Sequence, residues 1–155
     1  MRRLTVLGIG NILMRDEGIG PHLLQALSSA LDWGDDVEFI DGGAGGLSLL
    51  NIIEEANSLI VIDAAQMNLP PGEHRLLTPE QIEAEDSHQK LSLHEMPFIQ
   101  TLRLCEQYSR RPIDIVIFAI QPAEIGYGRE LSAALREKFP QLLEAAVELV
   151  RQRLA

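Results

Sequence analysis

Residues 4–20 read LTVLGIGNILMRDEGIG, and this stretch decides the fold that we predict. An apolar strand over residues 4–7 runs into a glycine turn, and a helix with proline in its first turn opens at Pro21. The loop between them carries two adjacent acids, Asp16 and Glu17. Open α/β sheets bind their ligands at the carboxyl ends of strands, where these acids lie. Two carboxylates there favour a cation over a phosphate.

Strand and helix patterns alternate along the rest of the chain. Further strands are predicted over residues 37–40, 59–62 and 113–120, with a short strand over 73–77 after the turn at 70–72. Helices are predicted over 21–31, 47–56, 95–108, 129–138 and 140–154, with a helical turn over 79–84 and an exposed loop over 85–93. This order predicts one α/β domain with a twisted, mostly parallel sheet flanked by helices on both faces.

Composition limits the classes of partner. The 155 residues include 13 basic and 23 acidic side chains, and the net charge of −10 argues against a nucleic-acid partner. Cys105 is the only cysteine, which excludes an internal disulfide and a thiolate zinc site. The apolar run after Arg2 and Arg3 is too short for a signal peptide, and no stretch approaches the ~20 apolar residues of a membrane span. We expect a cytoplasmic protein with no membrane partner.

Acidic residues follow three of the predicted strands. Asp16 and Glu17 follow the first strand, Asp41 ends the second, and Asp63 ends the third. Because these strand ends share one rim of a doubly wound sheet, the acids can converge. His94 follows a polar loop and can reach the same rim. One imidazole and two carboxylates suit a borderline divalent metal such as zinc or nickel.

Each of these residues also has a simpler interpretation. Asp63 alone is equally well explained as a helix N-cap, and Asp41 before two glycines as a turn residue. Cys105 lies on an apolar helix face and is interpreted as a core thiol. The remaining histidines are interpreted as surface residues: His22, His74 and His88.

A Rossmann-like nucleotide-binding protein is a competing interpretation. Gly8-Ile9-Gly10 begins a dinucleotide fingerprint, and Asp41 could hold a ribose. The third glycine of that fingerprint would fall on Leu13, and Asp16 and Glu17 would repel a pyrophosphate. We therefore favour the metal site.

The segment Gly8-Ile9-Gly10-Asn11-Ile12-Leu13, followed by Asp16-Glu17-Gly18-Ile19-Gly20, closely resembles the hydrogenase maturation proteases. The likeness continues, in order, at Asp41-Gly42-Gly43, Ile62-Asp63-Ala64 and Ser92-Leu93-His94. Proteases of this family remove the C-terminal extension from the large-subunit precursor of nickel–iron hydrogenases. The resemblance implies that residues 1–155 form a single peptidase domain whose partner is that precursor.

The resemblance also implies a role for each site residue. Glu17, Asp63 and His94 would be the metal ligands and the catalytic residues, with Asp16 a neighbour rather than a ligand. The substrate-binding residues would be Asp41, Gly42 and Gly43. Many members carry Thr where this chain has Ala44, so one hydroxyl contact to the substrate is missing here.

We therefore predict a metal-dependent endopeptidase that acts after nickel insertion, as a monomer. No Ser–His or Cys–His pair lies at a motif position and no HExxH helix is present, which disfavours covalent and zincin-type mechanisms. The resemblance implies a divalent metal, nickel carried by the substrate, for which cadmium or zinc can substitute. This metal would polarise the scissile carbonyl or activate a water, and both remain open. The alternative is a non-catalytic nickel-sensing chaperone or binding module that uses the same ligands.

Overall fold

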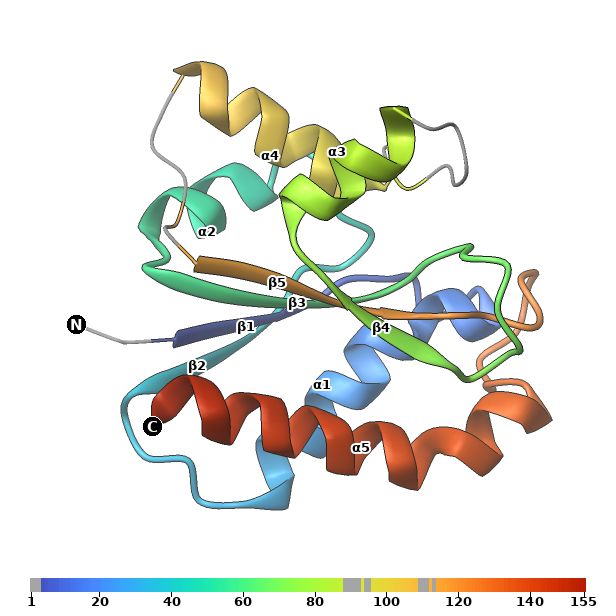
Figure 1. The fold of residues 1–155 in the computed structure, drawn as a ribbon. Helices are drawn as coiled ribbons and strands as arrows, with labels where there is room; N and C mark the ends of the chain where they lie inside the picture. Colours follow the sequence, from blue (N-terminus) through green and yellow to red (C-terminus); the bar gives the residue numbers. More distant parts are fainter. Residues whose placement is uncertain (1–3, 88–92, 94–95, 109–111, 113) are drawn as a thin grey trace.

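The computed structural model describes residues 4–87, 93, 96–108, 112 and 114–155, and a five-stranded sheet lies at its centre (Figure 1). The strands are β1 (Leu4–Gly8), β2 (Val37–Asp41), β3 (Ser58–Ala64), β4 (His74–Leu77) and β5 (Asp114–Ile120). Their spatial order is β2-β1-β3-β5-β4, and only β4, at one edge, runs antiparallel to its neighbour.

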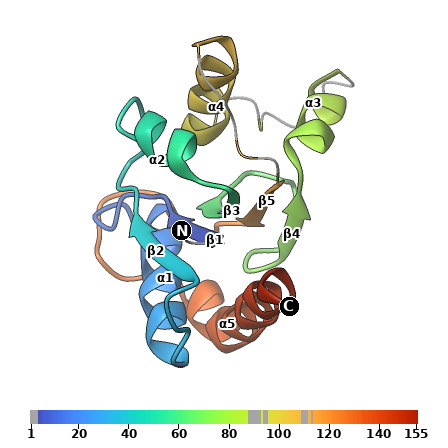
Figure 2. The same cartoon turned by 90° about the vertical axis from the view of Figure 1, so that its left-hand side faces the viewer.

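Helices cover both faces of the sheet. Their bounds are η1 (Arg15–Gly18, a 3-10 turn), α1 (Ile19–Ala30), α2 (Leu49–Glu55), α3 (Pro79–Ser87), α4 (Pro97–Tyr108) and α5 (Ala133–Leu154). Figures 1 and 2 show α2, α3 and α4 on one face, and α1 and α5 on the other. The predicted fold class is therefore confirmed. In the part of the chain that the structure describes, no helix is both long enough and apolar enough to cross a bilayer.

The central strands are apolar throughout because they supply two cores. Successive side chains of a strand point to opposite faces of its sheet. Leu59 and Val61 of β3 belong to the core beneath α2 and α4, whereas Ile60 and Ile62 belong to the core beneath α1 and α5. A parallel sheet covered on both faces therefore has strands that are continuous apolar runs rather than alternating ones.

Glycines allow α1 to lie directly on the sheet. A Cβ atom at Gly20 would be 2.2 Å from the carbonyl oxygen of Ile9 and 2.6 Å from that of Ile62. A Cβ atom at Gly8 would be 2.8 Å from the carbonyl oxygen of Gly20. No side chain fits in either place, so these glycines serve backbone packing, which is a different role from the phosphate cradle of a dinucleotide fingerprint.

The prediction of two helices over 129–138 and 140–154 is wrong. One helix, α5, runs from Ala133 to Leu154 with Pro140 inside it. Its N-cap is Ser132, whose side chain accepts a hydrogen bond from the backbone N–H of Leu135 at 3.3 Å. Pro140 removes one backbone donor, but buried residues before and after it, Leu135 and Leu142, hold both halves against the same core.

The exposed loop over 85–93 is also incorrectly bounded. Residues 85–87 belong to α3, which is longer than the predicted turn over 79–84. Thr78 caps this helix, because its Oγ1 accepts the backbone N–H of Gln81 at 3.2 Å and Gln81 Oε1 accepts the backbone N–H of Thr78 at 2.8 Å. Leu93 is buried, and residues 88–92 lie outside the described residues.

Candidate functional site

A pocket of about 350 Å³ opens beyond the carboxyl ends of β1 and β3. Its walls come from six separate segments of the chain. The lining residues are Ile9, Gly10, Asn11, Glu17, Ala44, Asp63, Ala64, Ala65, Gln66, Leu93, Met96, Pro97, Pro122 and Ile125. Two of the three predicted ligands, Glu17 and Asp63, therefore share one pocket. The interpretation of Asp63 as a helix N-cap is wrong, because Asp63 lies within β3 and the next element is β4.

Asp63 is the most strongly perturbed acid of this pocket. Its side chain is 7% exposed, and this burial raises the pKa of its carboxyl group to about 8. A hydrogen bond with the Ala64 backbone opposes this rise, while the negative charge of Glu17 adds to it. Two carboxylates that disfavour each other's charge form a site that a cation would stabilise.

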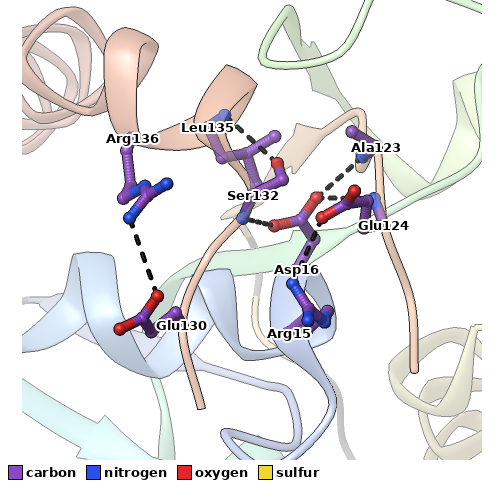
Figure 3. Close-up of polar contacts among 8 residues, drawn as sticks. All are labelled: Arg15, Asp16, Ala123, Glu124, Glu130, Ser132, Leu135 and Arg136. Carbon is purple, nitrogen blue, oxygen red and sulfur yellow. Dashed lines mark hydrogen bonds and ion pairs between the residues drawn. The ribbon is translucent and has the colours of Figure 1, made fainter. Parts of the chain in front are cut away.

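Asp16 is fully buried beside this pocket and accepts three backbone hydrogen bonds (Figure 3). Its Oδ2 accepts from the N–H groups of Ala123 and Glu124, and its Oδ1 accepts from that of Ser132, each at 2.8 Å. Burial by itself would raise the pKa of Asp16, but these three hydrogen bonds outweigh it and hold the pKa below its ordinary value of 3.8.

Asp16 therefore fixes the position of η1, which carries Glu17. The backbone N–H of Asp16 also donates to the carbonyl oxygen of Glu124 at 3.1 Å. The side chain of Arg15 contacts the Glu124 carboxylate at 3.3 Å. The structure places Asp16 next to a predicted ligand, as expected, but the sequence alone did not indicate what its carboxylate binds.

Gln121, which sequence reasoning missed, holds another wall of the pocket. This residue follows β5 and is 5% exposed. Its Oε1 accepts the backbone N–H of Met67 at 2.7 Å, and its Nε2 donates to Oε1 of Gln66 at 2.9 Å. The segment that follows Asp63 is thereby fixed in place. No local pattern marks such a residue, because its partners lie more than 50 positions away.

Asp41, Gly42 and Gly43 lie near the pocket, but none of them is among its lining residues. Asp41 is exposed at the end of β2, and its Oδ1 accepts the backbone N–H of Gly43 at 2.8 Å. The carbonyl oxygen of Gly43 accepts the N–H of Gly10 at 2.7 Å. The interpretation of Asp41 as a turn residue is thus confirmed, while β1 separates it from β3 and Asp63.

His94, the third predicted ligand, lies outside the described residues. Leu93 and Met96, which precede and follow it at short distance along the chain, both line the pocket. Within the described residues alone, no group of three or more His, Cys, Asp or Glu side chains is placed to hold a metal ion.

The other singled-out side chains lie away from this pocket. The surface interpretation is wrong for His22 and His74, which are both half-buried, and the ring of His74 stacks on Phe118 with centroids 4.6 Å apart. His88 lies outside the described residues. Cys105 is fully buried in α4, and burial raises the pKa of its thiol, which confirms a core thiol.

Comparisons with known proteins agree on one family. Residues 21–149 match the family model of the hydrogenase maturation proteases. The chain is 33% identical over 150 residues to the hydrogenase expression/formation protein HupD of Rhizobium leguminosarum bv. viciae, covering 96% of this chain and 74% of that protein. It is 30% identical over 151 residues to the hydrogenase 2 maturation protease of Escherichia coli (strain K12), covering 94% and 92%.

Solved structures share the fold over nearly the whole chain. The hydrogenase maturating endopeptidase HybD from E. coli superposes with a TM-score of 0.81 at 27% identity, covering 98% of this chain and 93% of that one. The [NiFe] hydrogenase maturation protease HybD from Thermococcus kodakarensis gives a TM-score of 0.75 at 28% identity, covering 96% and 99%.

Proposed function

We propose that this chain, which belongs to the hydrogenase maturation protease family, removes the C-terminal extension from the large-subunit precursor of a nickel–iron hydrogenase. Membership of the family makes it a protease that processes a hydrogenase precursor. The pocket at the carboxyl ends of β1 and β3 is the place where the scissile bond would bind.

We further propose that Glu17 and Asp63, together with His94, bind nickel that the precursor carries. The observation that supports this most is Asp63, a buried carboxyl group whose pKa of about 8 is raised by burial and by Glu17. A divalent cation between these acids would offset their repulsion, and Asp63 would release its proton as the metal binds. A precursor without nickel would leave Asp63 protonated and unable to act as a charged ligand, which gives a physical reason for cleavage after nickel insertion.

Within this proposal the chain contributes ligands and position rather than a nucleophile. Glu17 is held by η1 and Asp63 by β3, so both carboxylates sit on parts of the structure that are already ordered. Two carboxylates and one imidazole leave coordination positions open for the precursor's own ligands. These ligands would hold nickel where it could supply either polarisation of the scissile carbonyl or activation of a water.

The test is a mass-spectrometric assay for loss of the C-terminal peptide from nickel-loaded and nickel-free precursor. We expect cleavage of the nickel-loaded form only, and its loss in Glu17→Gln, Asp63→Asn and His94→Ala. Asp32→Asn is the matched control, since Asp32 is an exposed acid outside the pocket, and it should cut at the wild-type rate. Wild-type rates in any two of the three site variants would refute the assignment.

Two further outcomes have defined meanings. If the protein binds nickel-loaded precursor but never cuts it, the chain is the nickel-sensing binding module considered above. If protein purified without added metal retains stoichiometric zinc or nickel against a chelator, and stripping that metal abolishes cleavage of nickel-loaded precursor, the catalytic metal is resident and the substrate-borne model is wrong.

We also propose that Asp41 contacts the precursor, with Gly42 and Gly43 shaping the turn beside it. Asp41→Asn is the sharpest test, because an amide oxygen can keep the 2.8 Å hydrogen bond to Gly43 while the charge is lost. We expect a higher KM for precursor with kcat unchanged. Gly42 is unsuitable for a bulky replacement, because a Cβ atom there would be 2.9 Å from Leu7 Cδ1 and 3.0 Å from Leu49 Cδ2.

A further inference from the structure

We propose that Ile12, Leu13, Ile125 and Tyr127 form a docking platform beside the pocket for an apolar, extended segment of the precursor next to its scissile bond. We call these four residues the rim platform. The inference rests on the proposed function and adds to it the surface that selects the substrate chain, which the metal ligands alone do not provide.

The rim platform concentrates the exposed apolar side chains of the molecule. Eight large hydrophobic side chains are exposed among the residues that the structure describes, and half of them belong to the rim platform. Their exposed fractions are 48% for Ile12, 50% for Leu13, 49% for Ile125 and 91% for Tyr127. Single exposed apolar residues are ordinary on protein surfaces, whereas several together beside a pocket are typical of a binding surface.

Two loops that are far apart in sequence carry these side chains, and the backbone joins them. Met14 and Gly128 form a parallel bridge. The N–H of Gly128 donates to the carbonyl oxygen of Leu13, and the N–H of Arg15 donates to that of Gly128, each at 2.9 Å. Residues 12–15 and 125–128 therefore lie side by side.

The same loops are fixed in place before any substrate arrives. Figure 3 shows the carboxylate of Asp16 held by Ala123, Glu124 and Ser132, and residues 125–127 directly follow Glu124 along the chain. Loops that are ordered in the free protein lose less conformational entropy on binding than loops that must be ordered by their partner. An apolar surface held rigid in this way is suited to docking.

The rim platform is continuous with the pocket. Ile125 belongs to both, since it lines the pocket with Asp63 and is also half exposed. Asn11, which directly precedes Ile12, lines the pocket as well. A peptide bond bound at Asp63 must have chain leaving the pocket on both sides, and on this proposal one of the two sides crosses the rim platform at Ile125. Tyrosine and isoleucine there would contact apolar side chains of the substrate within a few residues of the cut.

The test compares rim variants with matched variants elsewhere. Tyr127→Ser is paired with Tyr108→Ser, because Tyr108 is 81% exposed at the end of α4. Leu13→Ser is paired with Leu76→Ser, because Leu76 is 47% exposed on β4. Binding of nickel-loaded precursor and steady-state cleavage are measured for all four. We expect each rim variant to raise Kd and KM at least about tenfold with kcat unchanged, the size of a lost interface anchor, and each control to match wild type.

Several results would overturn the inference and are distinguishable from failure of the proposed function. Wild-type cleavage with unchanged Kd and KM in both rim variants overturns the platform alone. An equal loss in rim and control variants also overturns it. A wild-type dimer in sedimentation velocity that Tyr127→Ser dissociates assigns the surface to a second copy instead. A wild-type protein that neither binds nor cuts the nickel-loaded precursor overturns both proposals. Tyr127→Phe keeps the ring and should keep KM, which separates a contact made by the ring from one made by the hydroxyl group.

Discussion

Replacing Asp16 tests whether its carboxylate holds the site together. Asp16→Ala would leave three backbone N–H groups, those of Ala123, Glu124 and Ser132, without an acceptor. Hydrogen bonds to a charged group contribute about 1.5–3 kcal/mol each, and they are not additive, so we expect a loss of about 3–4 kcal/mol of unfolding free energy. Asp16→Asn can keep its oxygen on two of these donors and should lose about 2 kcal/mol.

Urea unfolding followed by circular dichroism measures this loss. For a domain of this size a change of about 2 kcal/mol moves the urea midpoint by about 1 M. The control is Asp32→Asn, because Asp32 accepts a single hydrogen bond from Gly34 at an exposed turn and should shift unfolding by less than about 0.5 kcal/mol. An Asp16→Asn midpoint equal to that of wild type would refute the argument.

The pH dependence provides a second check on Asp16. Its pKa in the folded protein lies below the ordinary value of 3.8, so its contribution to stability is fully present above pH 3.8. The contribution is lost as the pH falls below 3.8 through the folded-state pKa, where Asp16 becomes protonated. The stability gap between wild type and Asp16→Asn should therefore be constant from pH 5 to pH 8 and shrink in more acidic buffer. A gap that grows on acidification would contradict the assigned cause.

Three further changes have defined expected outcomes. In the metal-free protein the pKa of Asp63 is about 8 in the folded state against 3.8 unfolded, so stability falls as pH rises from about 4 to about 8. Asp63→Asn removes that dependence. At pH 9 the variant should melt at least about 4 °C above wild type, which corresponds to about 1–2 kcal/mol of unfolding free energy. Thermal scans of both proteins at pH 5 and pH 9 measure this difference. Cys105→Ala should lose about 1 kcal/mol of stability and cut precursor normally in the mass-spectrometric assay, since a buried core thiol takes no part in catalysis; loss of cutting with folding intact would revive a thiol mechanism. Gly20→Ala should lose more than about 3 kcal/mol of unfolding free energy in urea, because its Cβ atom would lie 2.2 and 2.6 Å from backbone carbonyl oxygens. Gly34→Asn is the control. Gly34 lies in open space with φ of 72°, so its unfolding free energy should stay within about 0.5 kcal/mol of wild type.

The order of strands and helices could be predicted because each element carries its own periodicity. The segment around Ile117 is apolar enough to identify a central strand without any knowledge of its neighbours. The break expected at Pro140 was wrong because the continuity of α5 does not depend on a local sequence pattern. The rule that proline ends a helix is local, whereas the packing of Leu135 and Leu142 on one core, which keeps α5 continuous, is a tertiary effect.

Some residues of the candidate site could likewise be predicted from the sequence, and others could not. Glu17 and Asp63 could be placed at one rim from topology alone, because parallel strands end at the same edge of a sheet. The roles of Asp16 and Gln121 could not be predicted, because their hydrogen-bond partners are backbone groups of distant loops and any residue type has such groups. Proximity along the chain made Asp16 look like a companion of Glu17, when its contacts are with residues 123–132.

The hydrogen bonds of Asp16 have a consequence for the order of events during protein synthesis. They join one residue near the start of the chain to partners that follow it by 107, 108 and 116 positions. Closing so long a loop is slow and entropically costly, so these contacts form late in folding. Ser132 must leave the ribosome before all the hydrogen bonds that hold η1 can form, although Glu17 and Asp63 have both emerged long before. A nascent chain that has exposed its acids therefore still lacks a finished pocket, and activity waits for the last third of the polypeptide.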